Sequence, residues 1–164
     1  MLNMIAPFLS QRVLLNIYKQ TILPILDYGC IIWGVCGKSN SRRLERLQNQ
    51  AMRIILAANR RTCSQDIRNR PYVLSLDSRR WFLKLQSAFK IVRNVHCPHQ
   101  LEGYLVKRSD LHGRTLQDST LLNVTPTKTK MGQSTFKRDA AREWNGLPRE
   151  IRELNTLSKF KTYF

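Results

Sequence analysis

Apolar residues recur at helical spacing in several stretches of this chain, separated by polar and turn-forming segments. The clearest stretch begins at Ser41 and predicts one helix with a core side made of Leu44, Leu47, Ala51, Ile54 and Ile55. Similar spacing predicts a helix after Ser10 as N-cap, another from about Asp77, and a short one from Ser134 that stops at Asn145–Pro148. The pattern is therefore mainly helical.

Residues 24–33 are apolar nearly all round, which predicts a segment in the middle of the structure. Pro24 lacks the amide hydrogen of an interior helical position and predicts a kink, and Gly29 weakens the helix further. Asp27 stands alone in this run. A carboxylate there either pairs with a basic group, bonds to backbone near the helix end, or lies at a rim. Pairing with an arginine of the core is our working hypothesis.

Helical periodicity fades between His96 and Gln133, where proline and glycine accumulate and predict irregular chain. Within it, Leu121, Leu122 and Val124 indicate an extended piece. Residues 157–164 then predict a last helical turn or two. The expected fold class is mainly α, a helical bundle with a loop-rich region and short C-terminal helices, in which the tryptophans at 33, 81 and 144 are core anchors rather than stacking platforms for bases.

The charge changes this picture of an ordinary helical domain. The 164 residues carry 28 Lys and Arg against 11 Asp and Glu, a formal net charge of +17, and this excess is spread along the chain. Such a balance predicts a polyanionic partner, with RNA or DNA the leading candidate. The apolar stretch at residues 13–35 is interrupted by polar residues and makes a poor membrane span. With no secretory signal apparent, we expect an intracellular protein, nuclear or cytoplasmic, whose cysteines are small buried residues rather than a disulfide frame.

Catalytic signatures are missing from the sequence. It has no motif-like pair of carboxylates for two metals, no phosphate-binding glycine loop, no nucleophile elbow and no zinc-protease helix. We therefore expect no cofactor and no catalysis by this chain alone. A zinc site built on His96, Cys97 and His99 with Cys63 or the Cys30 and Cys36 pair is the alternative, although an ordinary polar loop explains these residues as well.

A one-signed row of arginines marks the predicted helix from Ser41. Glu45 is the acidic neighbour of this row, whereas solvated helices mix signs through i,i+4 pairs. A phosphate backbone along this face would offset the self-repulsion and release counterions. The residues expected to contact nucleic acid are Arg42, Arg43, Arg46, Asn49 and Arg53, with Arg60 and Arg61 as an extension that Arg68 and Arg70 could continue. A merely solvated face is the alternative interpretation.

Four motifs in order carry a resemblance to a known family. They are IYKQTILPILDYGCIIWG, RRLERLQNQAMRIIL, LSLDSRRWFLKLQSAFKI and STFKRDAAREWNGLPREIRELNTLSKFKTYF. Together they resemble the carboxy-terminal part of reverse transcriptases from non-LTR retrotransposons (LINEs) of the jockey-like and CR1-like sort. The resemblance covers nearly the whole chain. Its marker positions are Pro24, Asp27, Tyr28, Trp33, Trp144, Asn145, Leu147 and Pro148.

This resemblance implies a fragment of an RNA-directed DNA polymerase. Residues 1–62 would be a thumb-like region that grips template and primer, and residues 63–164 the region after the thumb, both within what we expect to be one compact unit. The catalytic palm motif of the Tyr-x-Asp-Asp type and the fingers are missing, so a palm and fingers would have to come from elsewhere in a parent polymerase. The alternative is a decayed remnant that acts as a structural or protein-interaction module with nonspecific polyanion binding. The oligomeric state stays open.

Overall fold

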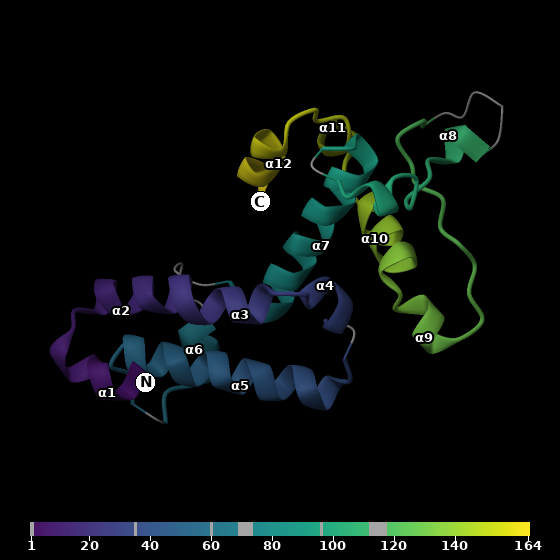
Figure 1. The fold of residues 1–164 in the computed structure, drawn as a ribbon. Helices are drawn as coiled ribbons and strands as arrows, with labels where there is room; N and C mark the ends of the chain where they lie inside the picture. The colour runs from purple at the N-terminus through teal and green to yellow at the C-terminus, as the bar shows by residue number, and fades with distance from the viewer. Residues whose placement is uncertain (1, 35, 60, 69–73, 96, 112–117) are drawn as a thin grey trace. The chain divides into compact units, whose positions relative to one another are not determined.

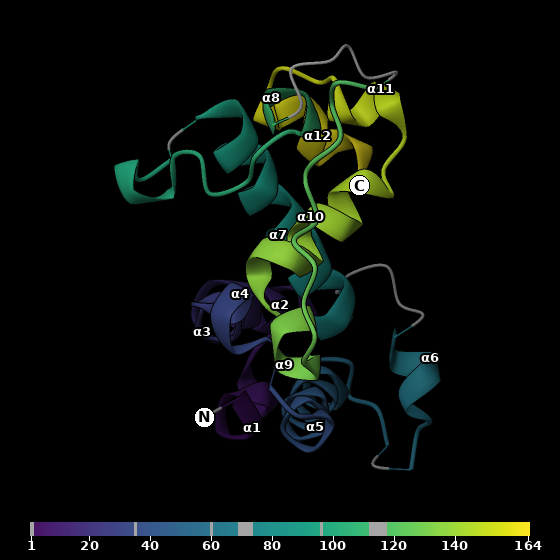
Figure 2. The same ribbon diagram turned by 90° about the vertical axis from the view of Figure 1, so that its right-hand side faces the viewer.

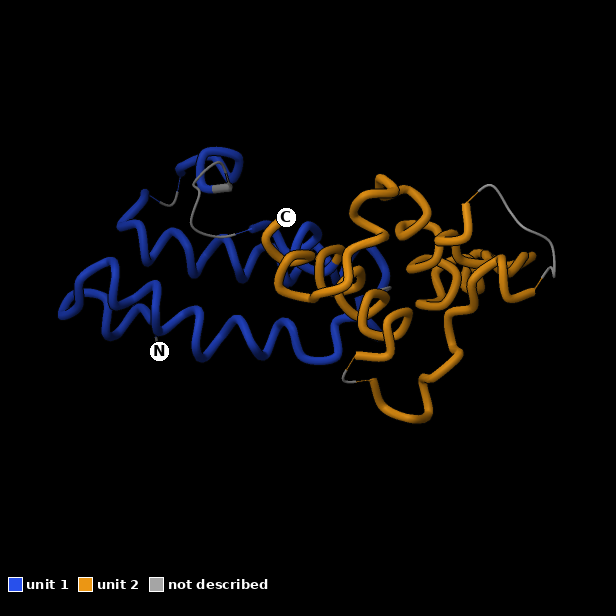
Figure 3. The backbone as a smooth tube through the Cα atoms, turned by 90° about the horizontal axis from the view of Figure 1, so that it is seen from above, with its two compact units in different colours: residues 1–80 blue, residues 81–164 orange. Residues whose placement is uncertain are grey.

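The chain forms two compact units, residues 1–80 and residues 81–164 (Figure 3). The computed structural model describes residues 2–34, 36–59, 61–68, 74–95, 97–111 and 118–164. Its fold is mainly α, as the periodicity predicts, and the described residues contain no named strand. The predicted boundary at residue 62 concerns family regions rather than compactness, and it stays a prediction.

The first unit is built from helices that lie alongside one another. They are α1 (Leu2–Ile5), η1 (Ala6–Phe8), α2 (Gln11–Ile17), η2 (Tyr18–Ile22), α3 (Leu23–Asp27), α4 (Cys30–Trp33), α5 (Lys38–Ile55), α6 (Ser64–Arg68) and the first residues of α7 (Leu76–Arg93). The row formed by α2 and α3 runs beside the long helix α5 (Figures 1 and 3). Ser10 is the N-cap residue of α2 as expected, although its side chain makes no capping bond.

The core of the first unit lies between these helices. It contains Leu2, Leu14, Tyr18, Leu23, Ala51, Met52, Ile55 and Ile67. Tyr18 is fully buried, and burial raises the pKa of its phenol above the ordinary value of 10.0. This core holds together segments far apart in the sequence.

The predicted core side of the helix from Ser41 is correct in part. Ala51 and Ile55 are buried, but Leu47 is 59% exposed and Gln48 is buried in its place. The Gln48 side chain donates a hydrogen bond to the carbonyl of Leu74, 3.1 Å away. Tertiary contact therefore rotates the buried face of α5 away from the one that hydrophobicity alone indicates, because a polar residue with a backbone partner can be buried without a large penalty.

The predicted break at Pro24 is absorbed by a π-helical turn, η2, that comes directly before it. Leu23 donates its amide hydrogen to the carbonyl of Tyr18, five residues back, and Pro24 then occupies the first turn of α3, where its missing amide costs little. Gly29 ends this run with φ of 62° as N-cap of α4. A side chain there would be strained in the left-handed region, which explains a glycine at this position.

The second unit packs α7 against the helices that follow it. These are η3 (His99–Leu101), α8 (Arg108–Leu111), α9 (Lys130–Gln133), α10 (Phe136–Asn145), α11 (Arg149–Arg152) and α12 (Leu157–Tyr163). Helices α7 and α10 lie side by side (Figures 1 and 2), joined by a bond from Trp81 to Glu143 and an ion pair of Lys84 with Asp139. Trp144 is fully buried in the core between Phe89 and Phe160, as a core anchor should be, while Trp33 and Trp81 are half-buried.

Outside the short helices η3, α8 and α9, the described residues between α7 and α10 are irregular, as their composition predicts. The expected extended piece is present as a single antiparallel bridge between Lys107 and Leu122. Beside the bridge, Arg108 donates to the carbonyl of Leu121 and Asn123 donates to the carbonyl of Val106. The carbonyl of Leu121 and the amide of Asn123 are therefore bonded across the bridge, whereas the amide and carbonyl of Leu122 point away from Lys107.

Cysteine placement differs in part from expectation. All four thiols are free, but only Cys30 is buried, whereas Cys36 and Cys97 are half-buried and Cys63 is exposed.

Among the helices in the described ranges, none combines the length and the apolar character needed to cross a membrane.

Candidate nucleic-acid interface

Three arginines form an open cationic surface on α5. Arg42, Arg43 and Arg46 are all exposed. Within the described part of the chain, none of the three forms an ion pair or a side-chain hydrogen bond. Their charges face solvent and are not ion-paired with any described residue, which is an arrangement that attracts a polyanion.

Arg53 and Asn49, also expected on this surface, are placed differently. Arg53 is half-buried, and its Nη2 donates to the carbonyl of Thr62 at 3.2 Å and to Oγ of Ser64 at 3.1 Å. Asn49 is only 8% exposed. The expectation of one open face is therefore wrong for these two residues: Asn49 faces inward, and Arg53, although on the same side of α5 as Arg42 and Arg46, is half-buried where it bonds the connection to α6.

The predicted extension of the surface is described only in part. Arg61 is exposed, while its backbone amide donates to Oδ1 of Asn59. Arg60 and Arg70 lie outside the described residues, as does the side chain of Arg68. The described cationic surface therefore consists of Arg42, Arg43 and Arg46, with Arg61 beyond the C-terminal end of α5.

The hypothesis that Asp27 pairs with an arginine is confirmed. Arg79, at the start of α7, donates from Nε and Nη2 to the two carboxylate oxygens of Asp27, at 2.7 and 2.6 Å. The bidentate hydrogen bond raises the pKa of Arg79 against the opposing effect of its burial. Asp27 thus joins the end of α3 to α7, and Tyr28, the next residue, is exposed.

Arg80 connects three helices in the same unit. Its guanidinium lies 4.9 Å from the ring centroid of Trp33 and donates to Oγ of Ser41 at 2.9 Å. The Trp33 indole in turn donates to the carbonyl of Tyr28 at 2.6 Å. Arg79 and Arg80 are not among the arginines that the charge pattern predicts to contact nucleic acid. The sequence signal that could have found them is the pair Arg79–Arg80 directly before Trp81, together with the lone carboxylate Asp27 in an apolar run.

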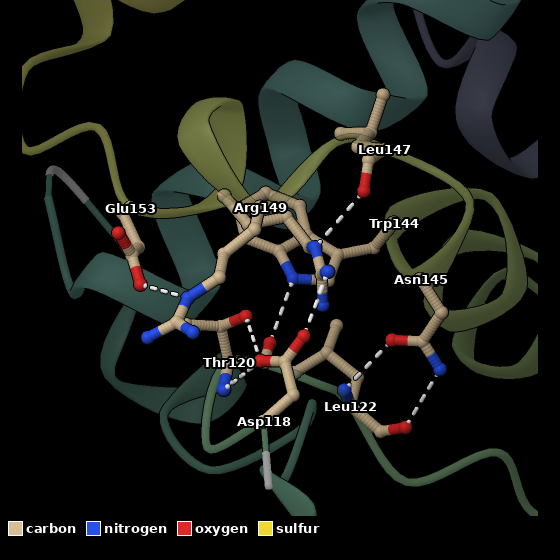
Figure 4. Close-up of polar contacts among 9 residues, drawn as sticks. Asp118, Thr120, Leu122, Trp144, Asn145, Leu147, Arg149 and Glu153 are labelled. Atoms are coloured by element: carbon tan, nitrogen blue, oxygen red, sulfur yellow. Dashed lines mark hydrogen bonds and ion pairs between the residues drawn. The ribbon is translucent and has the colours of Figure 1, made fainter.

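A second polar arrangement surrounds Asn145 in the second unit, and we call it the Asn145 clamp: Trp144 and Asn145 against Thr120 and Leu122 (Figure 4). The Asn145 side chain accepts from the amide of Leu122 at 2.8 Å and donates to the carbonyl of Leu122 at 2.9 Å. The Trp144 indole donates to the carbonyl of Thr120 at 3.2 Å. The Asn145 side chain therefore satisfies the two backbone groups of Leu122 that a neighbouring strand would bond in a sheet.

Arg152 extends this clamp toward Asp118. It is only 6% exposed, and it donates from Nε to the carbonyl of Leu147 at 3.0 Å and from Nη2 to Asp118 at 2.8 Å. Asp118 also accepts from the hydroxyl and the amide of Thr120 (Figure 4). The hydrogen bonds from Thr120, and after them Arg152, lower the pKa of Asp118 below its ordinary value. Pro148 precedes α11 as its N-cap.

The proposed zinc ligands are not seen to converge. Over the described ranges, no three side chains of histidine, cysteine, aspartate or glutamate gather as a metal site would require. His96 lies outside those residues. Cys97 contacts the carbonyl of Pro98, and His99 lies 3.5 Å from Glu102.

Part of the chain is similar to polymerases encoded by transposons. The probable RNA-directed DNA polymerase from transposon X-element of Drosophila melanogaster is 44% identical over 41 residues, which are 25% of this chain and 4% of that protein. The probable RNA-directed DNA polymerase from transposon BS of the same organism is 49% identical over 39 residues, 24% of this chain and 4% of that protein. No family model matches the chain and no solved structure matches it. The similarity thus spans about 4% of the length of these two curated relatives.

Proposed function

We propose that this chain is a nucleic-acid-binding, non-catalytic part of a retrotransposon RNA-directed DNA polymerase, in which α5 contacts the sugar-phosphate backbone of template and primer. The observation that carries the proposal is the row of Arg42, Arg43 and Arg46, exposed and without ion pairs among the described residues. The similarity to two transposon polymerases supports the same assignment.

The physical basis is the release of counterions from a phosphate backbone. Arg42 and Arg46 are one helical turn apart on α5, about 6 Å along the axis, so a single strand can meet both. Each phosphate that an arginine neutralises releases condensed cations and makes affinity fall with salt. In this assignment residues 1–62 act as the thumb-like region, residues 63–164 follow it, and the catalytic aspartates reside in a palm outside this chain.

A salt titration with matched variants tests the proposal. Binding of a labelled duplex is followed by fluorescence anisotropy over a series of salt concentrations for the unmodified chain, Arg42→Gln and Arg46→Gln. Each variant should reduce the slope of log affinity against log salt by about 0.9 on duplex DNA. Repeating the series with an RNA–DNA hybrid measures the preference for template-primer. The isolated chain should incorporate no nucleotides.

Lys159→Gln is the matched control, because Lys159 is an exposed cation on α12 and lies outside α5. It should leave the slope unchanged. Equal slope reductions for Arg42→Gln, Arg46→Gln and Lys159→Gln would show that charge acts only in bulk, and the proposal would then be wrong.

A second candidate function is a protein-interaction module. It is favoured by three large apolar side chains, Ile25, Tyr28 and Ile32, that are exposed on α3, α4 and the turn between them. Under this alternative the salt slopes of all cation variants would coincide. Serine substitutions at Ile25 and Ile32 would then reduce association measured by sedimentation velocity.

A further inference from the structure

A cavity of about 540 Å³ lies at the C-terminal end of α5, within the first unit. One wall comes from α1, η1 and the start of α2, and the other from the last turns of α5 and the residues after it. The apolar lining includes Pro7, Leu14 and Ile54, and the polar lining consists of Asn3, Gln11, Gln50 and Arg53. Its size lies in the range of sites that hold small ligands, roughly 300–1,000 Å³.

The cationic surface of α5 leads into this cavity. Arg42, Arg46, Gln50 and Arg53 follow one another at spacings of four, four and three residues, so they lie on one face of the helix. The first two are exposed cations, and the last two line the cavity. A nucleic-acid strand whose phosphates contact Arg42 and Arg46 therefore places its next nucleotide at the cavity.

The chemistry of the lining fits an uncharged heteroaromatic ring better than a phosphate. Three side-chain amides offer both donors and acceptors, as the edge of a nucleobase requires. Arg53 is the one charged residue of the lining in the described part of the chain, and its Nε is buried with no acceptor. The apolar wall suits the faces of a ring, whereas a phosphate would need further cations.

We propose that this cavity binds one unpaired nucleobase of the strand whose backbone lies along α5. The inference deepens the proposed function and rests on it. Phosphate contacts on Arg42 and Arg46 position the strand, and the amides of Gln11 and Gln50 bond the base edge. Affinity then depends on the base at one nucleotide, in addition to the phosphates.

The test compares two single-stranded DNA oligomers that differ only in their bases. One is an oligothymidylate of about eight nucleotides, and the other has the same phosphates and length but lacks the bases. The unmodified chain should bind the abasic oligomer roughly tenfold more weakly, the factor that one well-bonded base edge supplies. Photo-crosslinking of a 4-thiothymidine oligomer should label peptides within residues 3–14 or 50–58.

Substitutions inside and outside the cavity complete the design. Gln50→Trp places a large ring in the cavity lining and should remove the difference between the two oligomers without changing affinity for the abasic one. Gln20→Trp, at an exposed glutamine outside the lining, should retain the difference. The double variant Gln11→Ala, Gln50→Ala should reduce the difference with less risk to folding. Equal binding of both oligomers by the unmodified chain, with normal salt dependence, would overturn the cavity assignment and leave the proposed function intact. Binding of neither oligomer would also overturn the cavity assignment, and the salt titration with duplex DNA would then decide the proposed function separately.

Discussion

Replacing Asn145 by alanine should destabilise the second unit, because its side chain makes two hydrogen bonds to one buried residue. Leu122 has 0% exposure, and its amide and carbonyl bond to Asn145 at 2.8 and 2.9 Å. Each bond contributes about 0.5–1.5 kcal/mol net, and each buried backbone group left without a partner costs about 1–3 kcal/mol. Since the two penalties overlap and water can relieve part of them, Asn145→Ala should lower the free energy of unfolding by about 2–4 kcal/mol.

Urea denaturation followed by circular dichroism measures this loss, and amide hydrogen exchange at Leu122 locates it. Asn145→Asp keeps the acceptor for the Leu122 amide but sets a carboxylate against the Leu122 carbonyl, so it should also destabilise the unit. Asn155→Ala, at an exposed asparagine, is the matched control and should change stability by less than about 0.5 kcal/mol. If Asn145→Ala behaved like Asn155→Ala and Leu122 kept its exchange protection, the clamp would not stabilise this unit.

Three further perturbations test individual groups. Asp27→Asn should lower the free energy of unfolding by about 1–3 kcal/mol in a thermal or urea experiment, because it leaves Arg79 half-buried without its carboxylate. Asp77→Asn, at an exposed site, should lower it little, and equal effects of the two variants would contradict the pairing. Asp118 has a lowered pKa in the folded chain, so the stability it contributes is present above its ordinary value of 3.8 and is lost as pH falls through the folded value; Asp118→Asn should therefore flatten the acid limb of stability against pH. Tyr18 has a raised pKa, so stability should decline as pH rises above 10.0 toward the folded value, and Tyr18→Phe should remove that part of the decline in a urea series at alkaline pH.

Helical periodicity predicted the elements of this fold well where apolar residues were dense. The helix from Ser41 is observed as α5, and the helix from about Asp77 is observed as α7, Leu76–Arg93. The proline at position 24 was correctly expected to interrupt a regular helix. What the pattern could not show is that a π turn absorbs the interruption, because that depends on which carbonyl the chain can still reach once the proline amide is lost.

The candidate site was less predictable, because the buried face of a helix is decided by what packs on it. Periodicity assigned Leu47 to the core and Asn49 to the open face, and the structure reverses both assignments. Gln48 is buried since the carbonyl of Leu74, 26 residues away, accepts its hydrogen bond. A single sequence gives no indication of such a long-range partner, so the side of α5 that faces solvent could not be settled from spacing alone.

Two groups of arginines among the described residues have different consequences for binding. Arg53, Arg79, Arg80 and Arg152 direct their guanidinium groups to carbonyls, hydroxyls, a carboxylate or an indole ring inside their own unit. These cations join helices and connecting segments within their own unit, and their replacement should lower stability before it changes affinity for a polyanion. Arg42, Arg43 and Arg46 have no such bonds in the described residues, so their charge is available to a partner. The net charge of +17 therefore exceeds the number of cations available to contact phosphates. The number of phosphate contacts measured by the salt slope should match the exposed arginines on α5 rather than the total count of basic residues.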